Sequence, residues 1–143
     1  MGDFGKGVQG QVDRAKAALD LVPRKIALEV SRRVIVRTPV DTGRARGSWM
    51  PSLDSPARVD PGTLDRGEGA AVARAAETAT RMEGDTAFYL TSNLDYMPGL
   101  EEGHSKQAPA GMVGITVQEF SGIAGMAVRT WHSAGQAGGW YGE

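Results

Sequence analysis

The chain contains no cysteine, and only two of its 143 residues are histidine. The lack of cysteine excludes disulfide bonds and thiolate metal sites, and it fits a protein that is made and assembled in a reducing cytoplasm. The sequence also lacks an apolar run long enough to cross a membrane, and its first residues lack the apolar segment of a signal peptide. We therefore expect no membrane partner.

Aromatic residues are scarce as well, at 6% of the chain, whereas glycine is abundant, with 20 residues. A core must therefore be built mainly from aliphatic side chains and methionine. Each glycine inside a helix or strand costs about 0.5–1 kcal/mol relative to alanine, so loops should interrupt the regular elements. The length predicts a single domain over residues 1–143. The glycine-rich ends predict a flexible arm at about 1–10 and a flexible tail at about 135–143.

The net charge of −1 hides an uneven distribution along the chain. Residues 1–50 contain 10 lysines and arginines against 5 acidic residues, whereas residues 51–143 contain 6 against 12. A basic half can bind nucleic acid, or it can meet the acidic half of a neighbouring copy. Acidic residues are interleaved with the basic ones at Asp13, Asp20 and Glu29, which argues against nucleic-acid binding.

Apolar residues recur at intervals of three and four near the start of the chain, which predicts an amphipathic helix. The pattern runs through Val12, Ala15, Leu19, Val22, Ile26, Val30 and Val34. Pro23 interrupts it and should either open the main helix or divide it, at roughly 3 kcal/mol if the helix is forced to be regular. The helix should end before Pro39, because the residue preceding a proline disfavours the helical conformation.

The following patterns predict a small antiparallel sheet and further helices. Strands are predicted at 44–50 and 86–91, and a short or edge strand at 57–60 within a proline-punctuated stretch. An alanine-rich helix is predicted over 70–82 and a loop over 93–108.

Pro109 suits the first turn of a second main helix. Its apolar side would carry Val113, Val117, Phe120 and Ile123. The fold class is therefore α+β, with a long N-terminal helix, a small antiparallel sheet and a second helix packed on it.

Two segments of the chain carry a recognisable pattern. The first, TPVDTGRARGSW, spans residues 38–49. Pro39 ends the helix, Asp41 or Thr42 can bond the turn backbone, and Gly43 permits a positive φ. Taken alone, this segment is equally typical of any junction between a helix and a strand.

The second segment, YLTSNLDYMPGLEEGHSKQAPAGMVGITVQEF, spans residues 89–120. Together the two segments resemble the tail-completion and head–tail joining (neck) family of long-tailed bacteriophages, the family of the lambda-like minor tail protein Z. The matching positions are Leu90, Asn93, Tyr96, Leu100, Glu102, Gly103, His104, Ser105, Gln107, Pro109, Ala110, Gly111 and Met112. The chain departs from the family at Glu101, where a bulky residue such as tyrosine is usual, and at Met97-Pro98, which should stiffen the loop.

The resemblance implies a structural protein of the virion, placed in the neck at the head-proximal end of the tail and assembled in the bacterial host cytoplasm. It implies a homo-oligomeric ring, hexameric to suit the symmetry of the tail, that completes the tail and joins it to the head. The implied partners are further copies of the chain, connector or stopper proteins, and the tail-tube or terminator protein. Genomic DNA would pass the channel without sequence-specific contacts. A tail-terminator ring of the same neck is the alternative, followed by a nucleic-acid-binding protein.

The sequence does not predict an enzyme. Asp95, Glu101, Glu102 and His104 are residue types that bind metals or transfer protons, but their spacing matches no metal motif. Ser105 stands in GHSK rather than in a nucleophile motif, and the glycine clusters lack the context of a phosphate-binding loop. We therefore expect no catalytic residue, no cofactor, no metal and no small-molecule substrate.

Charged and aromatic residues are the candidates for contacts between subunits or with partners. We expect the basic side of the first helix, with Arg24, Arg32 and Arg33, to meet the acidic loop of the next subunit, with Glu101 and Glu102. We expect the C-terminal aromatic residues to anchor a partner. The candidates are Arg24, Arg32, Arg33, Arg44, Arg46, Glu101, Glu102, His104, Trp140 and Tyr141. For Trp131, a place in the core and a place in an interface are equally open.

Overall fold

The computed structural model describes residues 2–67 and 69–137, which form six helices and two strands. In chain order these are α1 (Gly2–Arg37), α2 (Arg44–Gly47), β1 (Met50–Leu53), α3 (Gly69–Thr80), β2 (Phe88–Thr91), α4 (Met97–Glu101), α5 (Val113–Gln118) and α6 (Phe120–Ala137). The long N-terminal helix and the small antiparallel sheet confirm the predicted α+β fold.

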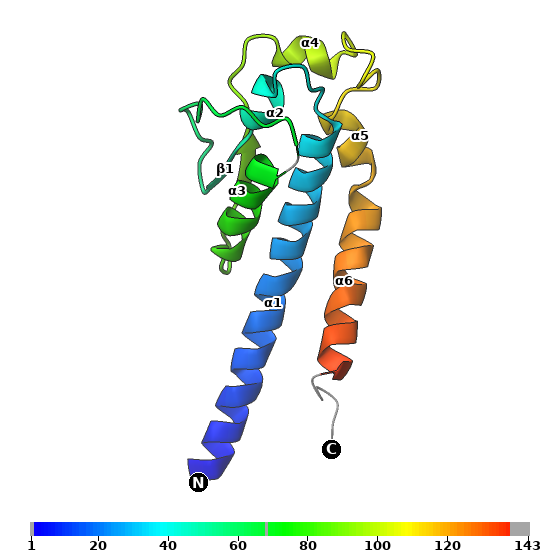
Figure 1. Cartoon of the computed structure of the whole chain (residues 1–143). Coiled ribbons are helices and arrows are strands. Elements are labelled where there is room, and N and C mark those ends of the chain that lie inside the picture. Colours follow the sequence, from blue (N-terminus) through cyan, green and yellow to red (C-terminus); the bar gives the residue numbers. More distant parts are fainter. Residues whose placement is uncertain (1, 68, 138–143) are drawn as a thin grey trace.

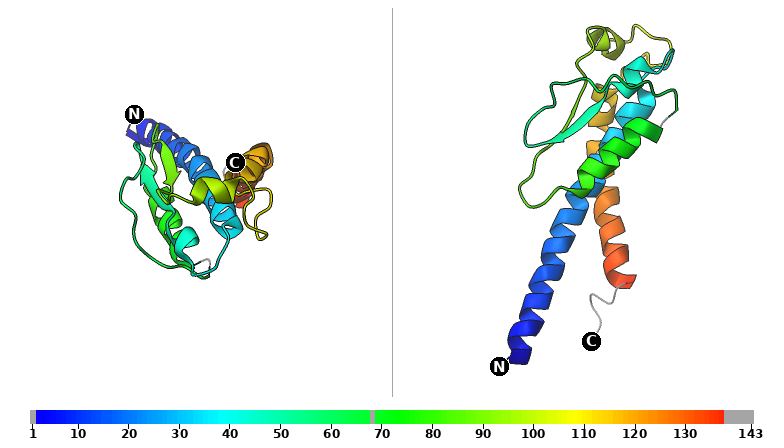
Figure 2. Two further views of the ribbon diagram at one scale, coloured as in Figure 1. Left: turned by 90° about the horizontal axis from the view of Figure 1, so that it is seen from above. Right: turned by 60° about the vertical axis from the view of Figure 1, so that its left-hand side comes forward.

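Helix α1 forms the long axis of the molecule, and the other elements are arranged around its second half (Figure 1). α3 packs against α1 and against β1, and α6 runs beside α1 on another side (Figure 2). α2, α4 and their loops gather where α1 ends. The first half of α1 projects beyond the sheet and α3, while α6 runs along part of it and diverges from it, so the start of the chain lies far from the sheet (Figure 1).

The structure corrects the prediction for Pro23, because α1 neither begins nor divides there. Proline removes one backbone hydrogen bond from a helix, and packing of the later part of α1 against α3 and α6 offsets that loss. α1 also reaches back to Gly2, so residues 2–10, the predicted flexible arm, are helical. At the other end α6 continues to Ala137, into the expected tail.

The two strands pair antiparallel, with Met50 opposite Thr91 and Leu53 opposite Phe88. β2 lies within the predicted strand 86–91, whereas residues 57–60 form no strand. Pro51 lies inside β1 and is tolerated there because each strand of a two-stranded sheet has a free edge.

The predicted strand over 44–50 is wrong for most of its length, because Arg44–Gly47 forms the helical turn α2. Gly43 precedes this turn with φ at 90°, a conformation that favours glycine. Gly47 lies so close to the Thr63 backbone that an added Cβ would stand 2.0 Å from its carbonyl oxygen. Tight packing between distant segments therefore sets the conformation here.

The alanine-rich helix is confirmed as α3. Ala71, Ala75 and Ala79 recur every four residues and are all buried. Their small side chains let α3 lie close to α1, and the two helices make the most extensive packing between elements in the described fold. The main core then gathers larger side chains around Ile35 and Trp49.

Two C-terminal predictions need correction. The predicted loop 93–108 contains α4, which is anchored by buried Met97. The helix expected from Pro109 begins at Val113 and breaks at Glu119, between α5 and α6.

This break changes which side chains face the core. Val113, Val117 and Phe120 are exposed, whereas Thr116 and Ile123 are buried. The expected apolar side is therefore correct only at Ile123. No described helix combines the length and the apolar character that a membrane span requires.

Candidate functional site

The two segments that carry the family resemblance meet in space near the end of α1. The side-chain amide of Gln107 accepts a hydrogen bond from the Val40 N–H at 2.9 Å and donates one to the Val40 carbonyl at 3.0 Å. Within the first segment, the Trp49 indole N–H donates to the buried Thr38 hydroxyl at 2.8 Å. Segments that lie 67 residues apart in the chain are thus joined into one unit.

Arg46, a predicted interface residue, closes the end of α1 instead. Its guanidinium donates to the carbonyls of Ile35 at 3.1 Å, Val36 at 2.9 Å and Thr38 at 3.2 Å. A fourth hydrogen bond reaches the Gly67 carbonyl at 2.9 Å. The last carbonyls of a helix lack partners within it, and the planar guanidinium can serve several of them at once. Arg46 therefore stabilises the fold of its own chain.

Arg44 is paired within the chain as well. One of its nitrogens lies 2.9 Å from Asp60 Oδ1, and a second contacts Asp60 Oδ2. The hydrogen bonds from Arg44 and from the Gly62 N–H hold the pKa of Asp60 below its ordinary value. The pair fixes the loop that follows β1 against α2.

Glu101, the residue that departs from the family pattern, holds the start of α5. Its carboxylate accepts hydrogen bonds from the N–H groups of Met112 and Val113, both at 2.9 Å, and of Gly114 at 2.8 Å. These are the donors that a helix start leaves unsatisfied. Partial burial would raise the pKa of Glu101, but the three hydrogen bonds outweigh it and lower the pKa.

Glu102 and His104 are both exposed in the loop that follows α4. Glu102 Oε2 lies 3.6 Å from His104 Nε2, and the two side chains are 71% and 69% exposed. A contact this exposed contributes little to stability. Both residues remain accessible to a partner.

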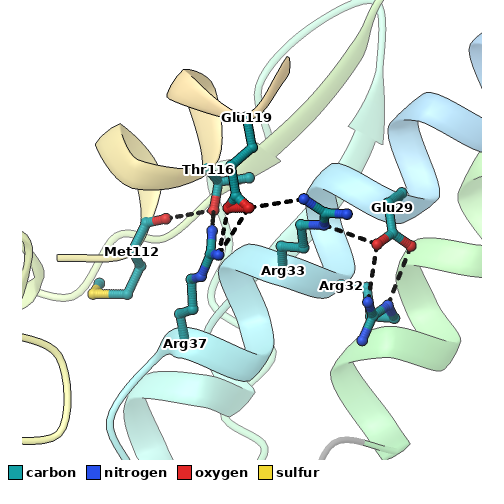
Figure 3. A network of polar contacts seen from close by, with 7 residues as sticks. All are labelled: Glu29, Arg32, Arg33, Arg37, Met112, Thr116 and Glu119. Carbon is teal, nitrogen blue, oxygen red and sulfur yellow. Dashed lines mark hydrogen bonds and ion pairs between the residues drawn. The ribbon is translucent and has the colours of Figure 1, made fainter. Parts of the chain in front are cut away.

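Three arginines, Arg32, Arg33 and Arg37, form a row on α1. Two of them bind Glu119 at the break between α5 and α6 (Figure 3). Arg33 donates to Glu119 at 2.8 Å, and Arg37 donates to the same carboxylate at 3.0 Å. Arg37 also donates to the buried Thr116 hydroxyl at 2.8 Å. The hydrogen bond from Arg37, with the nearby charge of Arg33, holds the pKa of Glu119 below its ordinary value against the effect of partial burial.

The same row continues to Glu29 one turn earlier. Glu29 accepts hydrogen bonds from Arg32 and Arg33, both at 2.9 Å, and the bond from Arg32 is the main cause of its lowered pKa. Sequence reasoning missed Arg37, Glu29 and Glu119 as members of this cluster. The four-residue spacing of Glu29, Arg33 and Arg37 was the available signal, because it marks one helix face.

Arg24 completes the basic side of α1, and its Nε donates to the Met82 carbonyl at 2.7 Å. Of the three arginines expected to meet a neighbouring subunit, Arg24 and Arg33 are thus bound to distant parts of their own chain. Arg32 is the most exposed of them, at 47%. The structure does not bring these arginines to Glu101 and Glu102 within one chain, so their contact across subunits stays a prediction.

The C-terminal aromatic candidates differ in what the structure records. Trp140 and Tyr141 lie outside the described residues. Trp131 is half-buried on α6, where its ring centroid lies 4.6 Å from that of His132. It is not a member of the core clusters formed by the described residues.

Sequence reasoning did not foresee two apolar surfaces. The first is a stripe of three exposed side chains, Phe4, Val8 and Val12, on the projecting half of α1. The second is a groove of about 380 Å³ between the middle of α1, the sheet and the start of α6. Exposed apolar surface of this kind is typical of proteins that bind other proteins.

Within residues 2–67 and 69–137, no group of three or more histidines or acidic residues is placed to hold a metal ion. Comparison with known protein families, with curated proteins and with solved structures gives no match to this chain.

Proposed function

We propose that this chain is a structural subunit of the neck of a long-tailed bacteriophage. Copies of it form a ring, hexameric to match the tail, that completes the tail and joins it to the head. The observation that carries the proposal is the contact between the two segments of the family resemblance, where Gln107 pairs with both backbone groups of Val40. A likeness whose residues pack together supports a shared fold better than one scattered over the surface.

The uses of the polar side chains also support a structural role. Arg46 serves the carbonyls at the end of α1, and Glu101 serves the N–H groups at the start of α5. Arg44 and Asp60 hold a loop in place. These residues organise backbone rather than gather around a shared reaction centre.

The alternative of nucleic-acid binding is disfavoured by the arginine row. Arg33 and Arg37 face Glu119, while Arg32 and Arg33 face Glu29 (Figure 3). Carboxylates at these positions repel phosphate and occupy the guanidinium groups that would bind it. Binding of DNA by the purified chain should accordingly be weak at physiological salt.

Electron microscopy of a lysate from a phage that lacks this gene tests the proposal. We expect full heads beside separate tails, and restoration of joined particles when the gene is supplied in trans. Misfinished tails would favour the terminator ring of the same neck. Normally joined particles in the absence of the gene would overturn the neck assignment.

Arg32 and Glu102 offer the sharpest test of the predicted contact between the basic helix and the acidic loop, because both are exposed. Arg32→Glu or Glu102→Lys alone should impair ring assembly, and the double change should partly restore it. Arg129→Glu, an exposed charge reversal on α6, is the control. Native mass spectrometry measures the assemblies. Normal rings from both single variants would remove this pair from the interface and leave the neck assignment standing.

A further inference from the structure

The projecting half of α1 exposes its apolar stripe to solvent. Phe4 is 77% exposed, Val8 43% and Val12 40%, and their four-residue spacing places them along one helix face. The same half of the helix contains three glycines within residues 5–10, and each of them disfavours helix. A helix without tertiary contacts is marginal in water, so burial of the stripe would stabilise this half.

The groove on the body of the chain is lined mainly by apolar residues, and it could receive an apolar side chain. Its walls include Pro23, Ile26 and Val30 on α1, Phe88 on β2, Met82 and Phe120. Among the described residues that line it, Ser31 alone is polar, and its buried hydroxyl has no hydrogen-bond partner. A cavity of about 150 Å³ can hold a benzene ring, so about 380 Å³ accommodates an aromatic side chain and a neighbour.

The stripe cannot fill the groove of its own chain, because both lie on one continuous helix. Phe4 and Ile26 are separated along α1 by roughly 33 Å, at 1.5 Å per residue. About five full turns separate Val8 from Ile26, so the stripe and the groove wall occupy the same face of α1. A second copy that faces this side of α1, shifted along the helix axis, would therefore bring its stripe to the groove.

We propose that the stripe of one copy packs into the groove of a second copy, with Phe4 and Val8 entering beside Ile26 and Phe120. Each chain carries one stripe and one groove, so head-to-tail contacts between copies cover both surfaces without another protein. Contacts of this kind can close into a ring. As a detail of the ring the contact rests on the proposed function, but the purified chain is sufficient to test it.

The absence of cysteine makes a cross-linking test direct. Val8→Cys protein and Phe120→Cys protein, mixed in the full-length form under mild oxidation, should yield a disulfide-linked pair that contains one of each. Val59→Cys replaces Phe120→Cys in the control, because Val59 is 81% exposed and lies outside the groove. Linkage of Val8→Cys to itself would show that stripes pack on each other. That result, or a mixture that links no better than the control, would overturn the proposal.

Charged substitutions provide an independent measurement. Phe4→Asp or Val8→Asp should weaken self-association roughly 10- to 100-fold, as expected from losing the burial of one large apolar side chain. Val59→Asp should leave association unchanged. Analytical ultracentrifugation measures the mass, and circular dichroism at the same concentration reports folding. Phe120→Asp, on the groove side, tests the contact without altering the projecting helix. Wild-type association of these variants would contradict the proposal.

The failures of the two proposals are distinguishable. A phage whose Val8→Asp protein no longer self-associates when purified, but which still joins heads to tails, would exclude this contact from the ring and leave the neck assignment intact. A contact found in the purified chain, together with normal particles from a phage lacking the gene, would overturn the neck assignment alone.

Discussion

The two ends of α1 belong to one helix but are stabilised in opposite ways. Near Thr38 the helix end is enclosed: Arg46 serves the terminal carbonyls, and Ile35 is fully buried. Near Phe4 the helix is exposed. A side-chain hydrogen bond in this part joins Gln9 to Asp13 of the same helix. One helix thus has one end buried in the core and the other end exposed to solvent.

Truncation of a core side chain should distinguish these ends most strongly. Ile35→Ala should lower the free energy of unfolding by about 2–5 kcal/mol, because the lost burial and the cavity both count. Val8→Ala in dilute protein should change it by less than about 0.5 kcal/mol, as is usual for exposed positions. Urea unfolding followed by circular dichroism measures both. Equal losses would contradict the contrast between the two ends.

Glycine substitutions should sharpen the contrast by acting with opposite signs. Gly47→Ala places a Cβ 2.0 Å from the Thr63 carbonyl oxygen, and relieving that clash should cost about 1–3 kcal/mol. An added Cβ at Gly7 meets nothing within 4 Å, so Gly7→Ala should stabilise the helix by about 0.5–1 kcal/mol. Thermal unfolding reports the first change, and amide hydrogen exchange in α1 reports the second. Stabilisation by Gly47→Ala would show that the packing there is not tight.

The adjacent acids of the loop offer a smaller, matched comparison. Glu101→Ala removes the acceptor for three N–H groups at the start of α5 and should cost about 1 kcal/mol. Glu102→Ala removes an exposed side chain and should be close to neutral. Chemical denaturation of the two variants side by side gives the difference. Identical stabilities would mean that Glu101 does not hold α5.

Acidification should leave the free energy of unfolding unchanged at first and then lower it. The pKa values of Glu29, Asp60, Glu101 and Glu119 all lie below their ordinary values, 4.5 for glutamate and 3.8 for aspartate. The unfolded chain therefore binds protons at higher pH than the folded chain, and acid favours unfolding. Stability should be constant above about pH 5 and decline as the pH falls through the folded pKa values.

Urea midpoints between pH 7 and pH 3 measure this decline. Glu119→Gln, which cannot ionise, should make it shallower. A midpoint independent of pH over this range would contradict the role assigned to the carboxylates.

Elements whose determinants are local could be predicted from the sequence. Buried alanines at four-residue intervals define α3, and a run of β-branched and aromatic residues defines β2. The helical turn at Arg44–Gly47 could not be predicted, because it depends on the approach of Thr63, which is distant in the sequence. The break at Glu119 could not be predicted either, since its arginine partners lie more than 80 residues away.

The candidate site shows the same limit for individual side chains. Charge alone drew attention to Arg46 and Glu101, but it does not reveal that their partners are backbone groups of the same chain. The exposed position of Phe4 on a helix could not be predicted for a similar reason, because the glycine-rich sequence around it predicted a flexible arm. Composition identified residues that matter, and tertiary contacts determined their roles.

The contacts of Arg33 and Arg37 with Glu119 also affect the orientation of α6, because a small rotation at Glu119 moves the far end of this helix. α5 ends one residue before Glu119 and α6 begins one residue after it, so the direction of α6 is set at this point. The 18 residues of α6 span about 27 Å at 1.5 Å per residue. A swing of about 10° at Glu119 would displace the far end by roughly 5 Å. Two guanidinium groups and one carboxylate therefore hold the start of α6, and packing along α1 through buried Ile123 and Ala127 holds the rest of its direction.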